Sequence, residues 1–585
     1  MNATGTGFLT EPQTVAEELA LALRRHKVEL LFGQSLPPAL ILACHRAGIR
    51  QVSYRTENMG GAMADGYARV SHRIGVVTAQ NGPAATLLVP PLAEALKASI
   101  PVVALVQDVM RANRDRNAFQ ELDQLGLFAP VAKWVERVDV ASRAVDYLDR
   151  AVVAATSGRP GPAVLLLPQD LIWEDACADG ARKASYGHYP LDRAQPEAQA
   201  VETAARMIAE AANPIVVAGG GVLSSQAWES LSALQDAASL PVATTVMGKG
   251  AVAETHPLSL GVLAYFSGTG GLGKQTKPLV QTSDLLVLIG SRTNQNGTDD
   301  WRNYPKDARV IHIDQDGEEI GRNYEADLRM IGDARATLIA LTAALERQDL
   351  GKRRAARPAL EARIAAAKSA ARREAAAQIE SAASPLRPER ILAEIAKQLD
   401  GESLIVTDAS YSSVWVANYL EAERPGQRFI TPRGLAGLGW GLPMAIGAKA
   451  ARPEARLICL VGDGGFGHSW VELETLVRSD MAFPIVVLNN GILGFQKHAE
   501  SARYGAYSDA CDLAPVDHAA LARACGCYGV AVDSPEGFAK ALAKALVADK
   551  ATVIDVATDQ NAYPPLNIYE EAQVLGGRRS EPLSA

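Results

Sequence analysis

Short apolar runs recur along this chain and are separated by longer stretches with helical periodicity. Runs of three to five apolar residues bounded by polar turns predict strands that are buried on both faces of a sheet. In the first 180 residues they alternate with expected helices, the first at residues 15–26, and this order predicts a parallel sheet wound on both faces. The expected strands of this block are residues 30–32, 51–54, 74–78, 102–106 and 163–167.

The same alternation of apolar runs and expected helices occurs twice more along the chain. A polar segment, residues 178–199, precedes a second block with apolar runs at 214–218, 285–289 and 310–313. An Ala-, Arg- and Glu-rich segment, residues 351–384, predicts a solvated helix and a linker before the third block. The sequence therefore predicts an α/β fold with three doubly wound parallel-sheet domains. Their expected bounds are residues 11–180, 200–345 and 386–560, with a tail or active-site flap at 561–585.

The third block carries the most informative motif. One apolar run, residues 457–461, leads into a glycine-rich turn, and a second, residues 484–488, leads into an Asn-Asn-Gly sequence. Open α/β sheets bind ligands at such carboxyl ends of strands. A carboxylate, an amide oxygen and a main-chain carbonyl suit Mg²⁺, and the glycines let the backbone approach a diphosphate. The predicted metal ligands are Asp463, Asn490 and the carbonyl of Ile492, and the predicted diphosphate loop adds Gly462, Gly464, Gly465 and Leu493.

This spacing resembles the signature of enzymes that use thiamine diphosphate (ThDP). A second resemblance lies near the other end of the chain, where a short strand is followed by Glu57 and a helix rich in small residues. That segment looks like the one around the activating glutamate of ThDP enzymes. The resemblance implies that the Glu57 carboxyl group lies beside N1′ of the aminopyrimidine and shares a proton with it.

Almost the whole chain resembles the acetolactate-synthase-like group of ThDP enzymes, which also contains 2-hydroxyacyl-CoA lyases, oxalyl-CoA decarboxylases and benzaldehyde lyase. The resemblance implies pyrimidine-binding, central and diphosphate-binding domains, in that order. It also implies a homodimer or homotetramer, with each active site between the first domain of one subunit and the third of its neighbour. Gly437 and Leu438 match the loop that holds a bulky apolar residue between the two cofactor rings, where acetolactate synthases commonly carry Met.

Further polar residues are candidates to stabilise a developing alkoxide or to relay protons. Gln120 lies in residues 117–123, which resemble a loop that borders the active site of acetolactate synthases. The other candidates are Gln34, Gln80 and Asn81 from one subunit and Gln496 and His498 from the other.

Two departures from acetolactate synthases bear on substrate and cofactor. Ala499 stands where those enzymes carry a Trp that helps to recognise the acceptor, so we expect altered substrate choice. Residues 293–297 replace their flavin-site pattern, so we do not expect tightly bound FAD. Strand-to-glycine turns at 219–221 and 290–292 leave an adenine nucleotide, ADP or CoA, as an alternative ligand.

Three functional hypotheses follow. The first is a carboligase of acetolactate synthase type acting on a 2-keto acid, and the second is a lyase or decarboxylase acting on a 2-hydroxyacyl- or oxalyl-CoA. The third, a non-catalytic subunit of the same fold, is disfavoured because Glu57, Asp463 and Asn490 are all present. A net charge of −8 gives no case for a nucleic-acid partner. No apolar run or leader-like pattern suggests a membrane or secretory protein, so we expect a cytoplasmic one.

Overall fold

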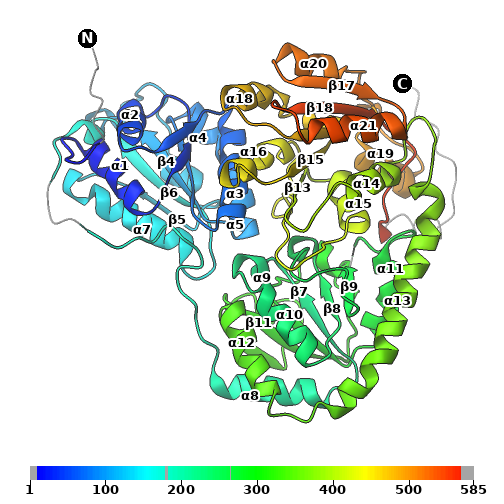
Figure 1. The fold of residues 1–585 in the computed structure, drawn as a ribbon. Coiled ribbons are helices and arrows are strands. Elements are labelled where there is room, and N and C mark those ends of the chain that lie inside the picture. Colours follow the sequence, from blue (N-terminus) through cyan, green and yellow to red (C-terminus); the bar gives the residue numbers. More distant parts are fainter. Residues whose placement is uncertain (1–8, 178–181, 264, 568–585) are drawn as a thin grey trace. The chain divides into compact units, whose positions relative to one another are not determined.

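The structure is a computed structural model that describes residues 9–177, 182–263 and 265–567 (Figure 1). The chain forms two compact units. The first contains the residues up to 192 together with 432–454 and 469–481, and the second contains 193–431, 455–468 and the residues from 482 onward. Most of the tail or flap expected at residues 561–585 lies outside the described residues.

Three six-stranded sheets, all with parallel pairing, confirm the predicted fold class. The first has the strand order β2-β1-β3-β4-β6-β5 and belongs to the first unit. Its strands are β1 (Leu30–Phe32), β2 (Arg50–Val52), β3 (Gly75–Ala79), β4 (Val102–Asp108), β5 (Trp134–Arg137) and β6 (Ala163–Pro168). Its helices are α1 (Val15–Arg25), α2 (Pro38–Arg46), α3 (Glu57–Ser71), α4 (Pro83–Leu87), α5 (Val89–Ala98), α6 (Gln124–Phe128) and α7 (Ala144–Thr156).

The second sheet has the order β12-β11-β10-β7-β8-β9. Its strands are β7 (Pro214–Ala218), β8 (Val242–Thr244), β9 (Ser259–Val262), β10 (Leu285–Ile289), β11 (Arg309–Asp314) and β12 (Leu328–Ile331). The helices of this block are α8 (Ala198–Glu210), α9 (Gly220–Ser224), α10 (Trp228–Ala237), α11 (Leu272–Gln281), α12 (Ala334–Leu345) and α13 (Gly351–Ile379).

The two faces of this second sheet belong to separate cores. Successive side chains of a strand point to opposite faces. Val216 and Val287 pack in a cluster with residues of α8, α10 and α12, whereas Val217 and Leu288 pack in another with residues of α11 and α13. Burial on both faces explains why β7 and β10 are continuous apolar runs, because neither face has room for a polar side chain.

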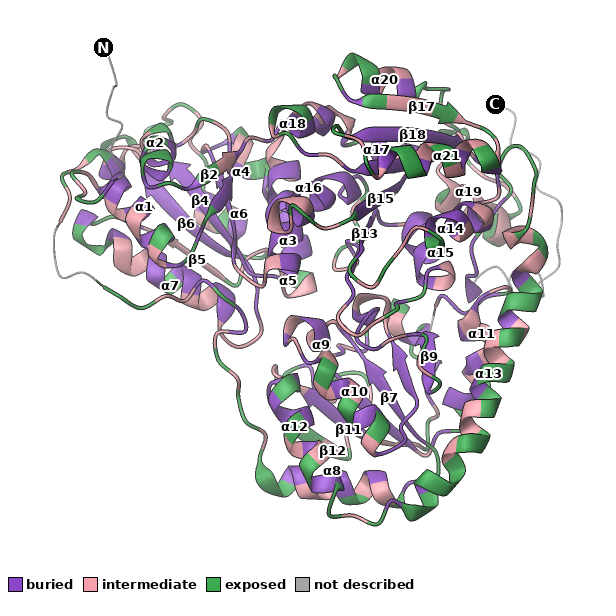
Figure 2. Cartoon of the chain, in the orientation of Figure 1, coloured by how far each residue is buried: buried purple, intermediate pink, exposed green. Residues whose placement is uncertain are grey.

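Helix α13 differs from the solvated helix expected here. It runs along the second block and is exposed over much of its length (Figure 2). However, Ile364 is fully buried in the core that covers one face of the second sheet. The Arg353 guanidinium is also buried, and it donates hydrogen bonds to the carbonyls of Ala238 and Ser239. Composition alone missed this docked face because only four of the 29 residues of the helix are buried, namely Arg353, Ile364, Ala371 and Ala375.

The third sheet has the order β14-β13-β15-β16-β18-β17. Its strands are β13 (Leu404–Thr407), β14 (Phe429–Ile430), β15 (Leu457–Gly462), β16 (Pro484–Asn489), β17 (Tyr528–Val532) and β18 (Thr552–Ala557). The helices of this block are α14 (Pro388–Ala396), α15 (Tyr411–Tyr419), α16 (Gly441–Ala451), α17 (Asp463–Phe466), α18 (Leu473–Arg478), α19 (Gly494–Tyr504), α20 (His518–Ala524) and α21 (Pro535–Ala545).

Helix α16 packs on α3 within the first unit, although the two helices are far apart in the sequence. Glycines permit the close approach. A Cβ on Gly66 would lie 2.3 Å from the carbonyl oxygen of Met444, and one on Gly447 would lie 2.0 Å from that of Met63. The small residues that follow Glu57 in the sequence thus have a packing role, since any larger side chain there would separate the helices.

Among the residues that the structure describes, none of the helices is both long and apolar enough to cross a lipid bilayer.

Candidate functional site

The predicted metal ligands lie on two neighbouring loops of the second unit. Strands β15 and β16 pair in parallel with Gly462 opposite Leu488, so the residues that follow them emerge at the same sheet edge. The Asp463 carboxylate joins the two loops. Its Oδ1 accepts a hydrogen bond from the backbone N–H of Gly464 (2.9 Å), and its Oδ2 accepts one from the N–H of Gly491 (2.7 Å).

Asp463 is buried without a cationic partner. Its side chain makes no ion pair with any residue in the described part of the chain, and desolvation by burial raises the pKa of its carboxyl group to about 6, although the two backbone amides act in the opposite direction. A buried charge is costly unless it is paired or coordinates a metal. A divalent cation at this carboxylate would supply the missing positive charge, so the donor set fits Mg²⁺.

The carbonyl of Ile492 is left free by the local backbone pairing. Ile492 faces Asp512 across an antiparallel bridge whose hydrogen bonds are made by the neighbouring residues, from Leu493 N–H to Cys511 (2.7 Å) and from Leu513 N–H to Gly491 (2.8 Å). In such a bridge the N–H and C=O of the central residue point away from the partner strand. The Ile492 N–H instead donates to Oδ1 of Asn490 (3.2 Å).

The glycines of the diphosphate motif have different surroundings. A Cβ on Gly464 would lie 2.7 Å from the Leu493 side chain, so this glycine lets the two loops approach each other. A Cβ on Gly462 would meet nothing within 4 Å. The open space beside Gly462 is where a ligand can approach the backbone at the start of α17.

Helix α19 carries the predicted Gln496 and His498, and none of its residues is buried. Gln496 donates to Glu500 on the same helix (2.6 Å). His498 Nε2 lies 2.9 Å from the carbonyl oxygen of Gln560, which can only accept, and its Nδ1 lies 2.8 Å from the Tyr411 hydroxyl. Burial lowers the pKa of His498. A neutral ring with Nε2–H donating satisfies both contacts, so any proton relay at His498 would involve the Tyr411 hydroxyl.

In the first unit, Glu57 is the first residue of α3 and follows the carboxyl end of β2. Thr56 caps the helix by accepting from the N–H of Met59. Gln34, beyond the end of β1, donates through its side chain to the carbonyl of Arg55 (3.2 Å). Gln34 and the residues before Glu57 therefore meet at one edge of the first sheet. Gln80 directly follows β3 at the same edge.

Asn81 holds the loop that carries Gln120. The Asn81 amide donates to the carbonyls of Phe119 (3.3 Å) and Gln120 (3.0 Å), and its oxygen accepts from Gln107 (3.2 Å). Gln120 has a positive φ of 60°, and a Cβ on Gly82 would lie 2.7 Å from its carbonyl oxygen. Left-handed backbone at a non-glycine residue is costly and persists only where the surroundings enforce it.

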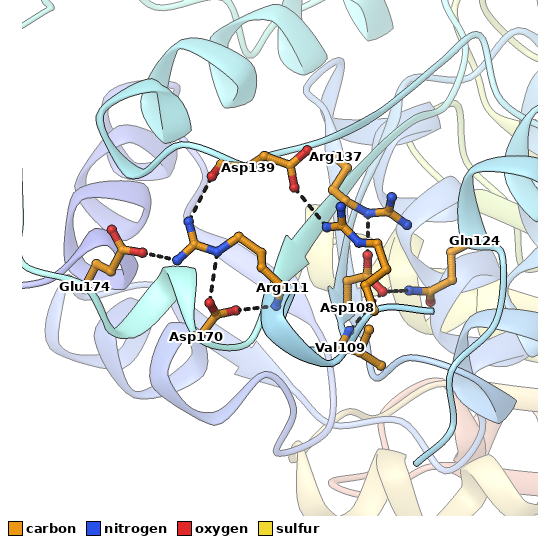
Figure 3. Close-up of polar contacts among 9 residues, drawn as sticks. Asp108, Val109, Arg111, Gln124, Arg137, Asp139, Asp170 and Glu174 are labelled. Carbon is orange, nitrogen blue, oxygen red and sulfur yellow. Dashed lines mark hydrogen bonds and ion pairs between the residues drawn. The ribbon is translucent and has the colours of Figure 1, made fainter. Parts of the chain in front are cut away.

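Polar contacts fix both ends of this loop: ion pairs of Asp108 and Arg111 hold its start, and a hydrogen bond from Gln124 to Asp108 holds its end (Figure 3). Asp108, the last residue of β4, pairs with Arg137 and accepts from the Gln124 side chain (3.0 Å). Arg111 donates to Asp170 (2.9 Å) and also pairs with Glu174. The residues between Arg111 and Gln124 therefore form a braced loop.

The Gly437–Leu438 segment also belongs to the first unit, where a buried carboxylate holds its backbone. Glu94 Oε1 accepts from the N–H of Gly434 (2.8 Å), and Oε2 accepts from the N–H of Leu435 and of Ala436 (3.2 Å). Glu94 has no exposed surface. The backbone of residues 434–436 is thus fixed directly before the predicted site residues.

Behind Glu94 lies a buried ion-pair cluster, in which Arg69 contacts both Glu94 (3.3 Å) and Asp65 (2.5 Å). Ala436 has a positive φ of 67°. The predicted steric residue, Leu438, is 39% exposed in this chain.

In the central block, the two glycine turns close on each other. The N–H groups of Gly219 and Gly221 donate to the carbonyls of Ile289 (2.8 Å) and Gly290 (3.0 Å). A Cβ on Gly219 would lie 2.2 Å from the Gly290 oxygen. These glycines therefore have a structural explanation that requires no nucleotide. In residues 293–297, Thr293 is held through its carbonyl and hydroxyl oxygens by the Asn323 amide.

The predicted site residues thus fall into two groups, one in each unit. The first unit contains Gln34, Glu57, Gln80, Asn81, Gln120, Gly437 and Leu438, and the second contains Gly462, Asp463, Gly464, Gly465, Asn490, Ile492, Leu493, Gln496 and His498. Glu94 and Glu472 were not singled out from the sequence, because their partners are backbone N–H groups hundreds of residues away.

Three family models for thiamine pyrophosphate enzymes match the chain in the order of its three sheets. They are the N-terminal TPP binding domain over residues 13–127, the central domain over 201–341 and the C-terminal TPP binding domain over 408–556. The fold and these matches define a ThDP-dependent enzyme.

Similar proteins of known family show where this chain belongs among the ThDP-dependent enzymes. The chain is 32% identical to a probable acetolactate synthase large subunit of Methanococcus aeolicus over 94% of this chain and 92% of that protein. It is also 32% identical to the acetolactate synthase large subunit of Parasynechococcus marenigrum over 94% of this chain and 89% of that protein. The chain belongs to the acetolactate synthase-like family of ThDP-dependent enzymes.

Proposed function

We propose that the protein is a ThDP- and Mg²⁺-dependent carboligase that decarboxylates one 2-keto acid and joins the remaining fragment to a second. The observation that carries the proposal is the buried Asp463 carboxylate, which makes no ion pair with any described residue and follows the strand next to the one that leads into Asn490 and Ile492. These three groups would hold Mg²⁺, and the open backbone beside Gly462 would receive the diphosphate. The relatives are acetolactate synthases, so the CoA lyase alternative is not favoured.

The proposed reaction balances without an external oxidant or reductant. In the first 2-keto acid the bond between the carbonyl carbon and the carboxylate breaks, and CO₂ leaves. The electron pair left on the carbonyl carbon then forms a bond to the carbonyl carbon of the second 2-keto acid, and a proton ends on the new hydroxyl oxygen. With pyruvate as both substrates, the product is acetolactate. Bound ThDP supplies the electron sink for this chemistry, and the protein supplies orientation and proton transfer.

Each group of site residues has its own task in this proposal. Glu57 holds the proton that activates the cofactor, and Leu438 fills space between its rings. Gln34, Gln80 and Gln120 would donate hydrogen bonds to oxygen atoms that become negatively charged during the reaction. Asn81 would position Gln120, since its amide donates to the carbonyls of Phe119 and Gln120. On α19, Gln496 and the His498–Tyr411 pair are candidates for substrate contact and proton relay.

We propose a homodimer or homotetramer, with Glu57 and Asp463 of each site supplied by different subunits, as the family resemblance implies. The substrate is a small 2-keto acid, and no nucleic acid is required. We further propose that the protein is cytoplasmic and that FAD is not tightly bound, with ADP or CoA as alternative ligands of the central domain.

The proposal is tested by incubating purified protein with pyruvate, ThDP and MgCl₂, and analysing the products. Acetolactate and CO₂ are expected, and both should disappear when EDTA removes the metal. A panel of other 2-keto acids, together with a 2-hydroxyacyl-CoA and oxalyl-CoA, covers the alternatives. Turnover of a CoA substrate with no product from any 2-keto acid would overturn the proposal.

A further inference from the structure

A buried carboxylate lies directly behind the backbone that leads into Glu57. Glu472 ends the short helix Trp470–Glu472, nine residues after Asp463 in the sequence, and has no exposed surface. Its two carboxylate oxygens accept hydrogen bonds from the N–H of Arg55 (3.0 and 3.1 Å), and Oε1 also accepts from the N–H of Thr56 (3.2 Å). All these residues belong to the first unit.

The carboxylate itself is held from its own helix. The Thr475 hydroxyl, one turn along, donates to Oε2 of Glu472 (2.6 Å). Desolvation raises the pKa of Glu472, whereas the Thr475 hydroxyl and the two backbone amides lower it. Because every contact to the group is a donor, the surroundings suit an acceptor-only carboxylate, and an amide in its place would turn N–H groups toward N–H groups.

The hydrogen bonds that Glu472 accepts lie immediately before Glu57 in the chain, where they control the position of that residue. Thr56 is the N-cap of α3, and Glu57 is the first helical residue. Fixing the N–H groups of Arg55 and Thr56 fixes the two peptide planes on either side of Arg55, immediately before the N-cap Thr56, and so constrains the backbone that leads into Glu57. The negative charge also lies near the N-terminus of α3, where the helix dipole favours it. Arg478 adds a further bond to this segment by donating to the carbonyl of Ser53 (2.8 Å).

We infer that Glu472 is a positioning residue for Glu57: its carboxylate holds the backbone of residues 55 and 56 so that the Glu57 carboxyl group is aimed at the cofactor. This inference rests on the proposed role of Glu57 as the activating acid. Glu472 acts through Glu57 and contacts no reacting atom. Displacement of a catalytic group by about 1 Å can cost on the order of 100-fold in rate, so loss of this clamp should be visible in activation.

The first test is amide hydrogen exchange in the protein without cofactor. Glu472→Gln should lose protection at the N–H groups of Arg55 and Thr56. The matched control is Glu474→Gln, two residues further on, because Glu474 is half-exposed and its ion pairs within the described residues are with the side chains of Arg55 and Arg478. Unchanged protection at residues 55 and 56 in Glu472→Gln would overturn the inference.

The second test is exchange of the thiazolium C2 proton of bound ThDP for deuterium, measured in wild type, Glu57→Gln, Glu472→Gln, Glu474→Gln and the double variant Glu57→Gln/Glu472→Gln. We expect Glu472→Gln to slow exchange at least about tenfold with less than about a threefold change in ThDP affinity. The double variant should be no slower than Glu57→Gln, because a residue that acts only through Glu57 has nothing left to position. A wild-type rate in Glu472→Gln, or additive losses in the double variant, would contradict the inference.

The outcomes separate the inference from the proposed function. A wild-type exchange rate in Glu57→Gln would refute the activating role itself, and with it the inference. Slow exchange in Glu57→Gln beside a wild-type rate in Glu472→Gln would refute the inference alone. Should Glu472→Gln not fold, Thr475→Val decides, since it removes the hydroxyl that donates to Oε2 of Glu472 and also lies 3.3 Å from the Ser53 carbonyl oxygen. Exchange slower than in wild type, with no further slowing in the Glu57→Gln background, supports the inference, and a wild-type rate overturns it.

Discussion

At the residue scale, this chain uses buried carboxylates in two distinct ways. Asp463 is buried with two backbone donors and makes no ion pair with any described residue, which is the basis of its proposed role as a metal ligand. Glu94 and Glu472 are buried with several backbone donors each, which satisfies them within the protein. A buried carboxylate keeps its charge only where hydrogen-bond donors or cations compensate for the lost water. This difference in compensation distinguishes Asp463, the proposed binding group, from Glu94 and Glu472, the positioning groups.

Replacing Asp463 should abolish cofactor retention. Asp463→Asn keeps the size of the side chain but removes the charge, and metal affinity should fall at least about 100-fold, since even indirect partners of a metal ligand commonly contribute 10- to 100-fold. The measurement is the ThDP and Mg²⁺ content after desalting. Asp509→Asn, an exposed carboxylate in the segment after α19, is the control and should retain both. Equal cofactor content in the two variants would contradict the assignment.

Replacing Glu57 should separate binding from activation. Glu57→Gln should bind ThDP with nearly wild-type affinity and fold normally, because Glu57 is only half-buried and Thr56 supplies the helix cap. Its product formation should fall at least about 100-fold, since the amide cannot share a proton with N1′ and general acid–base catalysis typically contributes that much. Calorimetric titration and a steady-state assay provide the two readouts, and unimpaired turnover would exclude the activating role.

At the scale of elements, apolar runs predicted several of the buried strands. Residues 214–218 and 285–289 were expected as strands and coincide with β7 and β10, since both faces of these strands are buried. The edge strand β17 has a mixed, partly exposed pattern and was not singled out. Asp463 and Asn490 could be found because they follow two such buried strands. Glu472 and Glu94 could not, because their hydrogen bonds depend on tertiary packing.

The segment before Leu438 should depend on Glu94. Glu94→Gln turns an N–H₂ group toward backbone donors and weakens the contact with Arg69, so the free energy of unfolding should fall by about 2–3 kcal/mol. Glu29→Gln, which alters an exposed pair with Arg73, should change it by less than about 0.5 kcal/mol. Denaturant titration of both variants measures the difference, and similar midpoints would show that Glu94 does not hold this segment.

Helix α19 should govern substrate choice. It follows the Asn490–Ile492 loop directly and has no buried residue, and Ala499 stands where a Trp occurs in acetolactate synthases. A small side chain lacks the stacking and the buried area that an aromatic ring provides. The wild-type protein should therefore show little preference for small acceptors. Ala499→Trp should shift preference toward pyruvate in a panel of 2-keto acids. An unchanged ranking would show that this helix does not set specificity.

At the scale of the whole molecule, the proposed site needs two subunits, and this can be tested by complementation. Inactive Glu57→Gln and Asp463→Asn proteins, when mixed and allowed to exchange subunits, would form dimers in which one site carries both changes and the other carries neither. About a quarter of the sites should then be intact if exchange is random. If each site were built within one chain, mixing would restore nothing. Wild type in the same exchange protocol is the control.

The absence of tightly bound FAD is a further prediction for the whole molecule. The turn after β10 is held by the chain itself, with Thr293 bonded to Asn323, and the proposed reaction involves no redox change. Protein purified without added cofactor should therefore show no visible flavin absorbance. A flavin spectrum of stoichiometric intensity would contradict this prediction. It would not contradict the proposed carboligase activity, which is tested separately.

The central claim is that this chain joins two 2-keto acids through ThDP and Mg²⁺. The most direct test is product analysis with carbon-13-labelled pyruvate and the cofactor-free protein, with ThDP and MgCl₂ added back singly and together. Only the complete mixture should form acetolactate, with one CO₂ released for every two pyruvate molecules consumed. Full ThDP binding without acetolactate from pyruvate or an analogous product from any other 2-keto acid would contradict it.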